Sequence, residues 1–492
     1  MQNAYEELEA IFRKVLILRS VKSLLRWDAE VMMPQKSHLL RAQQLSTLQT
    51  LTQELVFSSK VARLLKIVDA QKALLNPWQQ VNVALMQHQY QSLSSLPPKL
   101  IFKLDKAIRI AESAWFDARA DNNYKLFANA FDALLKVYRE KANRLAEHLG
   151  CSPYEALMDE YDPGRKQSTV DNLLNQVKPH YPGIIQKAQA RNLASTPIIG
   201  RYRKRTQYAL CRELLRLLHF PMDQGRLDES VHPFTEGIAQ DIRITTIFNR
   251  ENPLQTLMGL MHELGHALYD NGLPLAYRFQ LVGKDGGMLI HEGVALFWEK
   301  MLGCSQAFAT WLSHHMQAHF EHPEIWTPEN IFSHLTKVDP TLIRIEADEV
   351  CYMGHIILRY EIEKALFNDG LMAKDIPELW REKTVSLLGY HPQNLTQDCL
   401  QDIHWAHGYF GYFHTYGLGF LFAAQLFEFL HQHHPQVFTG IANGSFMPLL
   451  DWFKENLFQW GARFDADVLI TQLTQSPLQT QPFITYLQEK YR

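Results

Sequence analysis

The sequence predicts a mainly α-helical protein with a small β-sheet, and three observations support this fold class. Apolar residues recur at three- and four-residue spacing, as in amphipathic helices, over residues 5–25, 36–72, 99–148, 170–193, 206–219 and 352–368. Proline and glycine separate these stretches without a long low-complexity linker. Residues 238–248 alternate apolar and polar side chains and are rich in β-branched residues, which predicts a strand.

Composition limits the classes of partner. A chain of 492 residues with 46% hydrophobic content can bury a large core, and its length alone would allow two to four domains. A net charge of −3 provides no electrostatic footprint for nucleic acid or an anionic membrane. The short basic run at residues 201–205 predicts a solvated helix face. We therefore expect neither nucleic acid nor a membrane as an obligatory partner.

The cysteines and the N-terminus predict a cytoplasmic protein. The five cysteines are scattered and lack C-x-x-C spacing, which indicates reduced thiols. Residues 1–7 begin an acidic, amphipathic helix and do not resemble a signal sequence. The apolar segment 409–430 contains His414, Gln425 and Glu428, so a buried helix explains it better than a membrane span.

Residues 260–270 carry the pattern H-E-x-x-H, formed by His262, Glu263 and His266. Residues four apart lie on one face of an α-helix, so the two imidazoles can bind one ion. A zinc ion held by neutral imidazoles lowers the pKa of its water to about 7, and an adjacent carboxylate can accept the proton during attack on a carbonyl. The surrounding apolar residues predict a helix inside an enzyme core. A surface helix with two ordinary histidines is the alternative.

A catalytic zinc site usually has three protein ligands and a water, so a third ligand must be found. The metzincin pattern would need glycine at 269 and histidine at 272, where this chain has Tyr269 and Gly272. A downstream glutamate is the other common solution. Residues 291–299 predict a second helix after a glycine-rich loop, and Glu292 in it is the expected third ligand. Glu299 is the alternative, two turns further along a nearly matching face.

The predicted strand 238–248 lies shortly before the H-E-x-x-H helix. An extended peptide can pair its backbone with the edge of a sheet, so this strand is a candidate binding edge for a substrate. A purely structural sheet is the alternative.

Further motifs accompany the run from His262 to Glu292. In chain order they are LRWDAEVMMP at 25–34, HPF at 232–234, DIRIT at 241–245, IRIEAD at 343–348, and LQDIHW at 400–405 followed by GYFHTY at 411–416. Over nearly the whole chain, this series resembles the carboxypeptidase Taq family of zinc metallopeptidases.

The resemblance implies a fold, a metal and a substrate class. The expected fold is a large, mainly α, saddle-like metallopeptidase with a deep cleft lined by a small β-sheet. We expect one metallocarboxypeptidase unit over residues 1–492, with an N-terminal helical part at about 1–200 and a zinc-bearing part at about 201–492. The expected cofactor is Zn²⁺, with Co²⁺ or Mn²⁺ as other metals. Peptides with a free C-terminus are the expected substrates, and a homodimer the expected assembly.

An exopeptidase must also bind the terminal carboxylate, and arginine suits this because its planar guanidinium donates two charge-assisted hydrogen bonds. The resemblance implies that Arg344, in the 343–348 motif, has this role. An internal ion pair with Glu346 or Asp348 is the alternative. We expect His404, Tyr412 and Gln401 to contact the substrate as well.

A tetrahedral intermediate needs a hydrogen-bond donor for its developing oxyanion besides the metal. The candidates are Tyr416, Tyr412 and His232, with Tyr416 as the first, and His232 and His404 are expected to line the cleft. Asp270, one turn after His266, is expected either to fix the tautomer of that histidine or to be solvated.

The chain departs from the family pattern at four positions: Val294 stands for Gln, Leu296 for Arg, Asp398 for Gly and His414 for Pro. These changes fall on groups that support the cleft, so they bear on substrate preference or turnover more than on metal binding.

The predicted function is that of a zinc-dependent metallocarboxypeptidase with Glu263 as general base. A metallo-oligopeptidase that cuts internal bonds is one alternative. A zinc-binding scaffold without turnover is the other.

Overall fold

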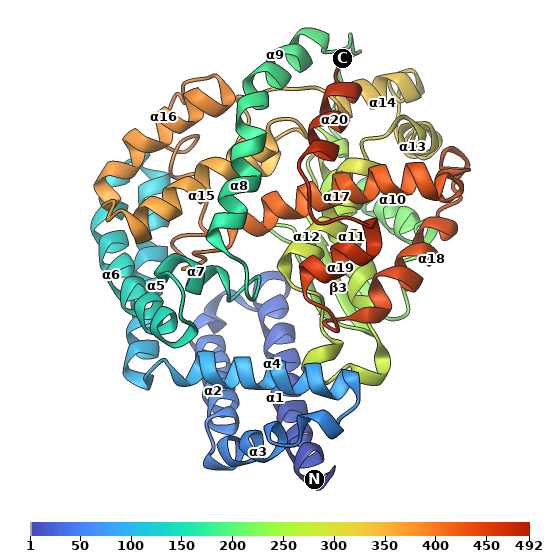
Figure 1. Cartoon of the computed structure of the whole chain (residues 1–492). Helices are drawn as coiled ribbons and strands as arrows, with labels where there is room; N and C mark the ends of the chain where they lie inside the picture. Colours follow the sequence, from blue (N-terminus) through green and yellow to red (C-terminus); the bar gives the residue numbers. More distant parts are fainter. Residues whose placement is uncertain (1) are drawn as a thin grey trace. The chain divides into compact units, whose positions relative to one another are not determined.

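The structure is a computed structural model that describes residues 2–492. The chain forms two compact units, each made of three segments. Unit 1 contains Met1–Leu93, Thr196–Phe332 and Phe429–Pro477, and unit 2 contains Ser94–Ser195, Ser333–Glu428 and Leu478–Arg492. Helices occur along the whole chain and one three-stranded sheet accompanies them (Figure 1). The predicted mainly α class with a small sheet is confirmed.

Unit 1 contains the sheet and the H-E-x-x-H helix. Its helices are α1 (Gln2–Val31), α2 (His38–Val56), α3 (Ser59–Asp69), α4 (Pro77–Ser94), α10 (Lys204–Leu217), α11 (Pro253–Gly272), α12 (Met288–Leu296), α13 (Gln306–His319), α14 (Pro328–Leu335), α18 (Met447–Asn456) and α19 (Ala466–Thr474). A π-helical turn, Phe297–Leu302, directly follows α12. α4 extends by its last residue, and α14 by its last three, into the segments of unit 2.

Unit 2 is helical. Its helices are α5 (Pro98–Ala120), α6 (Tyr124–Leu149), α7 (Pro153–Met158), α8 (Gln167–Val177), α9 (Tyr181–Arg191), α15 (Tyr352–Asn368), α16 (Ile376–Leu388), α17 (Phe413–His433) and α20 (Gln481–Lys490), with the last residues of α17 in unit 1. α17 is largely buried, as predicted for the segment 409–430. Within residues 2–492, no helix is both long and apolar enough to cross a membrane.

Several predicted helices are correct in position but too long. The stretch 36–72 is divided at Ser58, whose side chain caps α3 by accepting a hydrogen bond from Val61 N at 3.4 Å. The stretch 99–148 is divided at Asn123, which caps α6 in the same way. Polar capping residues satisfy the free N–H groups of a new helix, and apolar periodicity does not detect them. The stretch 352–368 coincides with α15.

The sheet has the order β1-β3-β2, with β1 (Gly225–Glu229) parallel and β2 (Thr235–Ile238) antiparallel to β3 (Asp241–Thr246). The strand predicted at 238–248 is therefore correct for β3 but wrong at its start. Ile238 ends β2, and the chain reverses at residues 239–240, where Gln240 adopts a φ of 77°. The alternation of side chains continues through this turn, so the sequence pattern merges two strands.

The two faces of the sheet contact different helices. Arg226, Arg243 and Glu236 lie side by side across the three strands, on the face that meets α1. The ring of Trp27 on α1 has the guanidinium carbons of Arg226 and Arg243 at 4.7 and 4.3 Å from its centroid. The opposite face, which carries Thr235, packs against α11. α1 and α11 thus enclose the sheet.

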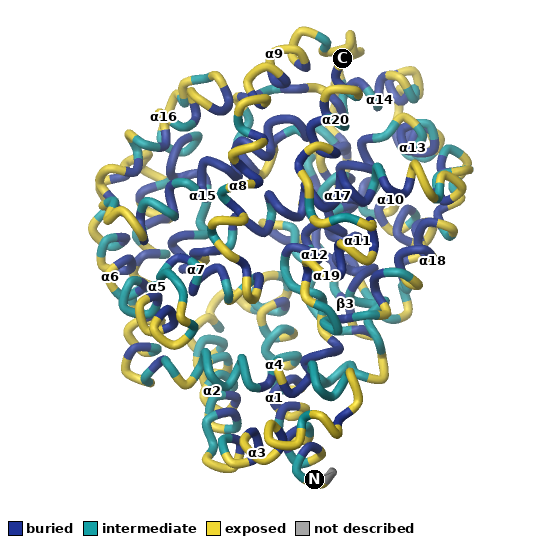
Figure 2. Tube along the Cα trace, in the orientation of Figure 1, coloured by how far each residue is buried: buried dark blue, intermediate teal, exposed yellow. Residues whose placement is uncertain are grey.

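α11 and α12 are deeply buried (Figure 2). They approach each other closely at Gly265. A Cβ atom on Gly265 would lie 2.6 Å from the Cα of Ala295 and 3.2 Å from the carbonyl oxygen of Val294. Only glycine allows this separation, and the separation brings Glu292 of α12 to the histidines of α11.

Replacing Gly265 with alanine should force α11 and α12 apart. We expect a loss of about 1–3 kcal/mol in the free energy of unfolding, the usual cost of overpacking, measured by urea denaturation. G259A in the same helix is the matched control, because a Cβ there finds no atom closer than 3.7 Å. Equal stability of the two variants would contradict the close approach.

Candidate active site

The H-E-x-x-H residues lie in the middle of α11, and α12 supplies the glutamate. The rings of His262 and His266 are 4.9 Å apart between centroids. Oε2 of Glu292 lies 3.7 Å from Nε2 of His262 and 3.9 Å from Nε2 of His266. One ligand atom from each of the three residues falls within 4.8 Å of the others. In the part of the chain that the structure describes, no other group of three histidine, cysteine or acidic residues meets this condition.

This donor set fits a divalent metal ion. Two imidazoles and one carboxylate are a common set for a catalytic zinc, which keeps a fourth position for water. Burial lowers the pKa of His266 well below its usual range and so favours the neutral imidazole that binds metals. Burial also lowers the pKa of His262, but Glu299 and the neighbouring carboxylates raise it to about 9, so this residue gives up a proton when it binds an ion.

Glu299 hydrogen-bonds to His262 and lies outside the group formed by His262, His266 and Glu292. Its Oε2 accepts a hydrogen bond from Nδ1 of His262 at 2.9 Å, and its Oε1 lies 2.7 Å from Nζ of Lys300. Burial raises the pKa of Glu299, but Lys300 and His262 lower it to about 2. The π-helical turn sets this position, since the N–H of Gly303 donates to the carbonyl of Trp298, five residues earlier, at 3.0 Å.

Glu263 is held by the sheet. The hydroxyl of Thr235 on β2 lies 2.8 Å from Oε2 of Glu263 and 2.9 Å from its main-chain carbonyl oxygen. Burial raises the pKa of Glu263 to about 7. Sequence reasoning missed Thr235, although it directly follows the HPF motif, because a single hydroxyl on a short strand gives no pattern of its own.

The predicted role of Asp270 toward His266 is wrong. Asp270 Oδ1 instead lies 3.1 Å from Nε2 of His291, the residue before Glu292. The ring of His291 stacks on the ring of His266, with centroids 4.3 Å apart and planes inclined by 17°. Because α12 carries His291 into the space beside Asp270, this carboxylate orients His266 only indirectly, through the stacked ring.

Arg344 belongs to a cluster in unit 2. Its Nε and Nη2 lie 3.0 and 2.9 Å from Oδ1 of Asp402, and Arg359 binds Oδ2 of the same carboxylate. Oε1 of Gln401 accepts hydrogen bonds from Arg359 Nη2 at 2.7 Å and from Arg344 N at 2.9 Å. The ion pair with Glu346 or Asp348 is therefore wrong: the partner is Asp402, which sequence reasoning missed together with Arg359.

Three further predicted residues lie in the same cluster. The ring of His404 is nearly parallel to that of Tyr412, with centroids 6.3 Å apart, and Tyr412 and Tyr416 are 4.9 Å apart. The guanidinium carbon of Arg344 lies 5.6 Å from the centroid of Tyr416. His232 lies in unit 1, between β1 and β2, where its carbonyl accepts a hydrogen bond from Ser230 Oγ at 2.6 Å. The structure thus brings His262, His266 and Glu292 together in unit 1 and Arg344, Gln401, His404, Tyr412 and Tyr416 together in unit 2, and His232 is an exposed residue of unit 1.

The departures from the family pattern are accommodated locally. Val294 and Leu296 are buried in α12. Asp398 Oδ2 accepts a hydrogen bond from Arg381 at 3.0 Å, and burial raises the pKa of Asp398 to about 6. Buried His414 has Nε2 3.7 Å from Oδ2 of Asp162. None of the four side chains displaces a member of the His–His–Glu group.

A mainly helical fold in which an H-E-x-x-H helix meets a glutamate of the next helix defines a metallopeptidase. Comparison with known proteins confirms the family: the model of the carboxypeptidase Taq (M32) metallopeptidases matches residues 7–491. The chain belongs to this family and is a metallocarboxypeptidase.

Relatives from distant organisms align over almost the full chain. Thermostable carboxypeptidase 1 of Thermus thermophilus is 32% identical, covering 99% of this chain and 98% of the relative. The structure of Trypanosoma cruzi metallocarboxypeptidase 1 superposes with a TM-score of 0.97 at 31% identity and covers 100% of both chains. The carboxypeptidase of Pyrococcus furiosus superposes with a TM-score of 0.93 at 28% identity, covering 99% of both chains.

Replacing Glu299 with glutamine should weaken metal binding. The change removes the charged acceptor that holds His262, and loss of such a partner typically costs about 10–100-fold in metal affinity. The dissociation constant would be measured by competition with a chelator, with E251Q, an exposed glutamate of the same unit, as the matched control. An unchanged affinity would show that the hydrogen bond does not orient the ligand.

Proposed function

We propose that this metallocarboxypeptidase binds Zn²⁺ through His262, His266 and Glu292 and uses Glu263 as the general base that removes C-terminal residues from peptides. The observation that carries the proposal is the convergence of the three ligand atoms within 4.8 Å, with Glu263 next to His262 in sequence. Binding of Co²⁺ or Mn²⁺ in place of Zn²⁺ stays a prediction.

When bound, the ion would act as a Lewis acid toward the scissile carbonyl and would make a water molecule more acidic. Glu263 takes the proton of the attacking water and delivers it to the departing amine. A carboxyl with a pKa of about 7 suits both steps, because it accepts and returns a proton near neutral pH. Thr235 fixes one oxygen of this carboxylate and so sets its orientation.

Arg344 binds the terminal carboxylate of the substrate. Asp402 holds one edge of its guanidinium through Nε and Nη2, and Gln401 holds its backbone and the neighbouring Arg359. The planar group is therefore presented in one orientation, which a bidentate contact with a carboxylate requires.

Aromatic side chains around Arg344 complete the substrate contacts. Tyr416 is the proposed donor to the oxyanion, with His232 as the second candidate, and His404 and Tyr412 contact the peptide. The position of Tyr416, Tyr412 and His404 in one cluster with Arg344 supports these roles.

The strand predicted at 238–248 as the binding edge is β3, which is paired on both sides and therefore has no free edge. The substrate backbone pairs with β2 instead. This strand is at the edge of the sheet, and its first residue, Thr235, contacts the proposed base. Main-chain hydrogen bonds to an edge strand bind a peptide without regard to its side chains, which fits the broad specificity expected of the family. A homodimer and a cytoplasmic location stay predictions.

Replacing Glu263 with glutamine should abolish hydrolysis while the metal remains bound. The amide has nearly the same shape but cannot accept the proton of the water, so we expect kcat to fall by at least about 100-fold. Metal content by mass spectrometry of the native protein serves as the control. A variant that retains both metal and activity would refute the role of this residue as the base.

A peptide with a free C-terminus and its amidated counterpart separate the possible reactions. We expect loss of single C-terminal residues from the free peptide only, because the amide removes the charge that Arg344 binds. A chelator should stop the reaction, and mass spectrometry follows the products. Internal cuts in both peptides would instead indicate an oligopeptidase, and binding of zinc without any cleavage a scaffold.

A further inference from the structure

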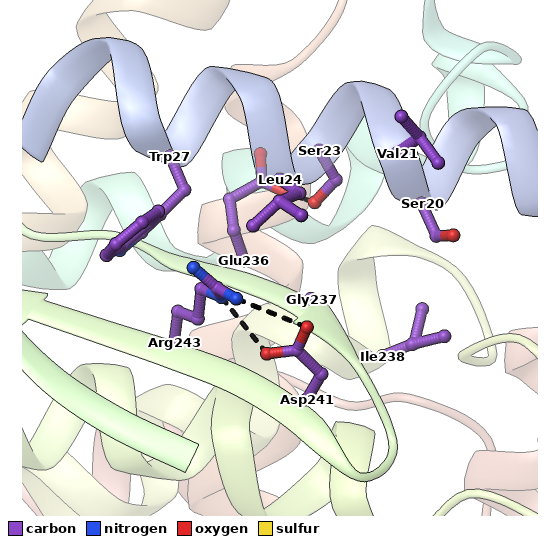
Figure 3. A pocket seen from close by; sticks show the side chains of 10 residues that line it. All are labelled: Ser20, Val21, Ser23, Leu24, Trp27, Glu236, Gly237, Ile238, Asp241 and Arg243. Atoms are coloured by element: carbon purple, nitrogen blue, oxygen red, sulfur yellow. Dashed lines mark hydrogen bonds and ion pairs between the residues drawn. The ribbon is translucent and has the colours of Figure 1, made fainter. Parts of the chain in front are cut away.

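A pocket of about 120 Å³ lies between α1 and the β2–β3 hairpin of unit 1 (Figure 3). It opens on the face of the sheet opposite to Glu263. Val21 and Leu24 of α1 and Ile238 of β2 supply apolar walls, and Glu236 of β2 supplies a carboxylate. Val21 and Leu24 are each about 40% exposed, so the pocket is accessible from solvent.

Among the described residues, no basic side chain donates a hydrogen bond to Glu236, and Arg26 of α1 acts on this carboxylate only electrostatically. Asp241 is already paired with Arg243, at 3.0 and 3.3 Å between the two oxygens and the guanidinium nitrogens. Glu236 instead accepts a hydrogen bond from the uncharged hydroxyl of Ser23. Ser20, Ser23 and the Asp241–Arg243 pair also line the pocket. The carboxylate of Glu236 beside the apolar walls matches a side chain that has an aliphatic stem and a cationic end.

The position of the pocket along β2 relates it to the substrate. Phe234 O accepts a hydrogen bond from Thr245 N of β3 at 2.9 Å. Because antiparallel strands alternate, the backbone groups of Thr235 and Gly237 then point to the open edge of the sheet. A peptide paired there has its side chains alternately on the α11 face, with Glu263, and on the α1 face, with the pocket.

The direction of the peptide follows from the reaction. A carboxypeptidase substrate has one residue beyond the scissile bond. The strand that continues from Thr235, beside Glu263, to Ile238 is therefore available to residues on the N-terminal side of that bond. The three residue steps from Thr235 to Ile238 correspond to about 10 Å, which is the length of about three substrate residues.

We propose that this pocket is a specificity subsite that binds a lysine or arginine side chain within about three residues upstream of the scissile bond, with Glu236 as its anionic end. The inference rests on the proposed function, since it places a peptide on β2. It adds a substrate preference that the metal site and Arg344 do not determine.

The test compares peptides that carry lysine, norleucine or glutamate at each of the three positions before the scissile bond. We expect kcat/KM for lysine to exceed that for norleucine by about two- to fivefold at one position, as for one partly exposed ion pair. In E236Q the ratio of lysine to norleucine should fall to about one. E229Q on β1, whose glutamate pairs with Lys204 outside the pocket, is the matched control and should keep the ratio.

Equal use of lysine and norleucine at all three positions, or a ratio that persists in E236Q, would overturn the subsite. If the wild-type protein cleaves none of the peptides, the proposed function fails. Binding of the same peptides to the wild type and to E236Q, measured by calorimetry, then decides the subsite separately, because a loss of lysine preference in E236Q supports it and equal binding refutes it.

Discussion

The close approach of α11 to α12 is the constraint on which the metal site depends. Gly265 allows the backbone of Ala295 to contact α11 directly, and this contact brings Glu292 to within 4 Å of both histidines. A larger separation would leave the His262–His266 pair with two ligands, which does not complete a catalytic site. The π-helical turn that follows α12 also depends on this close approach, because it directs Glu299 to Nδ1 of His262. One glycine thus permits both the proposed third ligand, Glu292, and the contact of Glu299 with His262.

The sheet connects catalysis to substrate binding through the alternation of its strands. Successive residues of β2 point to opposite faces, so Thr235 contacts Glu263 on the α11 face while Glu236 faces α1. The motif at 241–245 and the motif at 25–34 meet on the α1 face of the sheet, where Arg243 lies against the ring of Trp27. This contact fixes α1 on the sheet at a place far from the metal ligands in sequence. The contact between Arg243 and Trp27 therefore explains the structural role of both motifs.

The sequence predicted the elements that depend on local periodicity. His262 and His266 follow from helical spacing, and Glu292 from its place in a second predicted helix. What it could not predict depends on contacts between elements. Glu299 resembles a ligand in a regular helix, and only the π-helical turn shows its actual partner. Asp270 of α11 binds His291 because α12 packs against α11 and brings this histidine beside it. The pairing of Arg344 with Asp402 joins residues 58 positions apart, which no local pattern reveals.

The two groups of site residues have opposite charge imbalances, and each imbalance fits its proposed ligand. The carboxylates of Glu263, Glu292 and Glu299 surround the histidines of unit 1. Lys300 forms an ion pair with Glu299. His262, with a pKa of about 9, adds a second positive charge, and a divalent cation would replace its proton and balance the carboxylates. In unit 2, two guanidinium groups share the carboxylate of Asp402 and hold its pKa well below the usual range, although burial acts in the opposite direction. Breaking one partner from such a buried group is costly, so Arg344 stays oriented, and the second positive charge remains available to a substrate carboxylate. The ion pair that positions the arginine therefore does not neutralise the cluster.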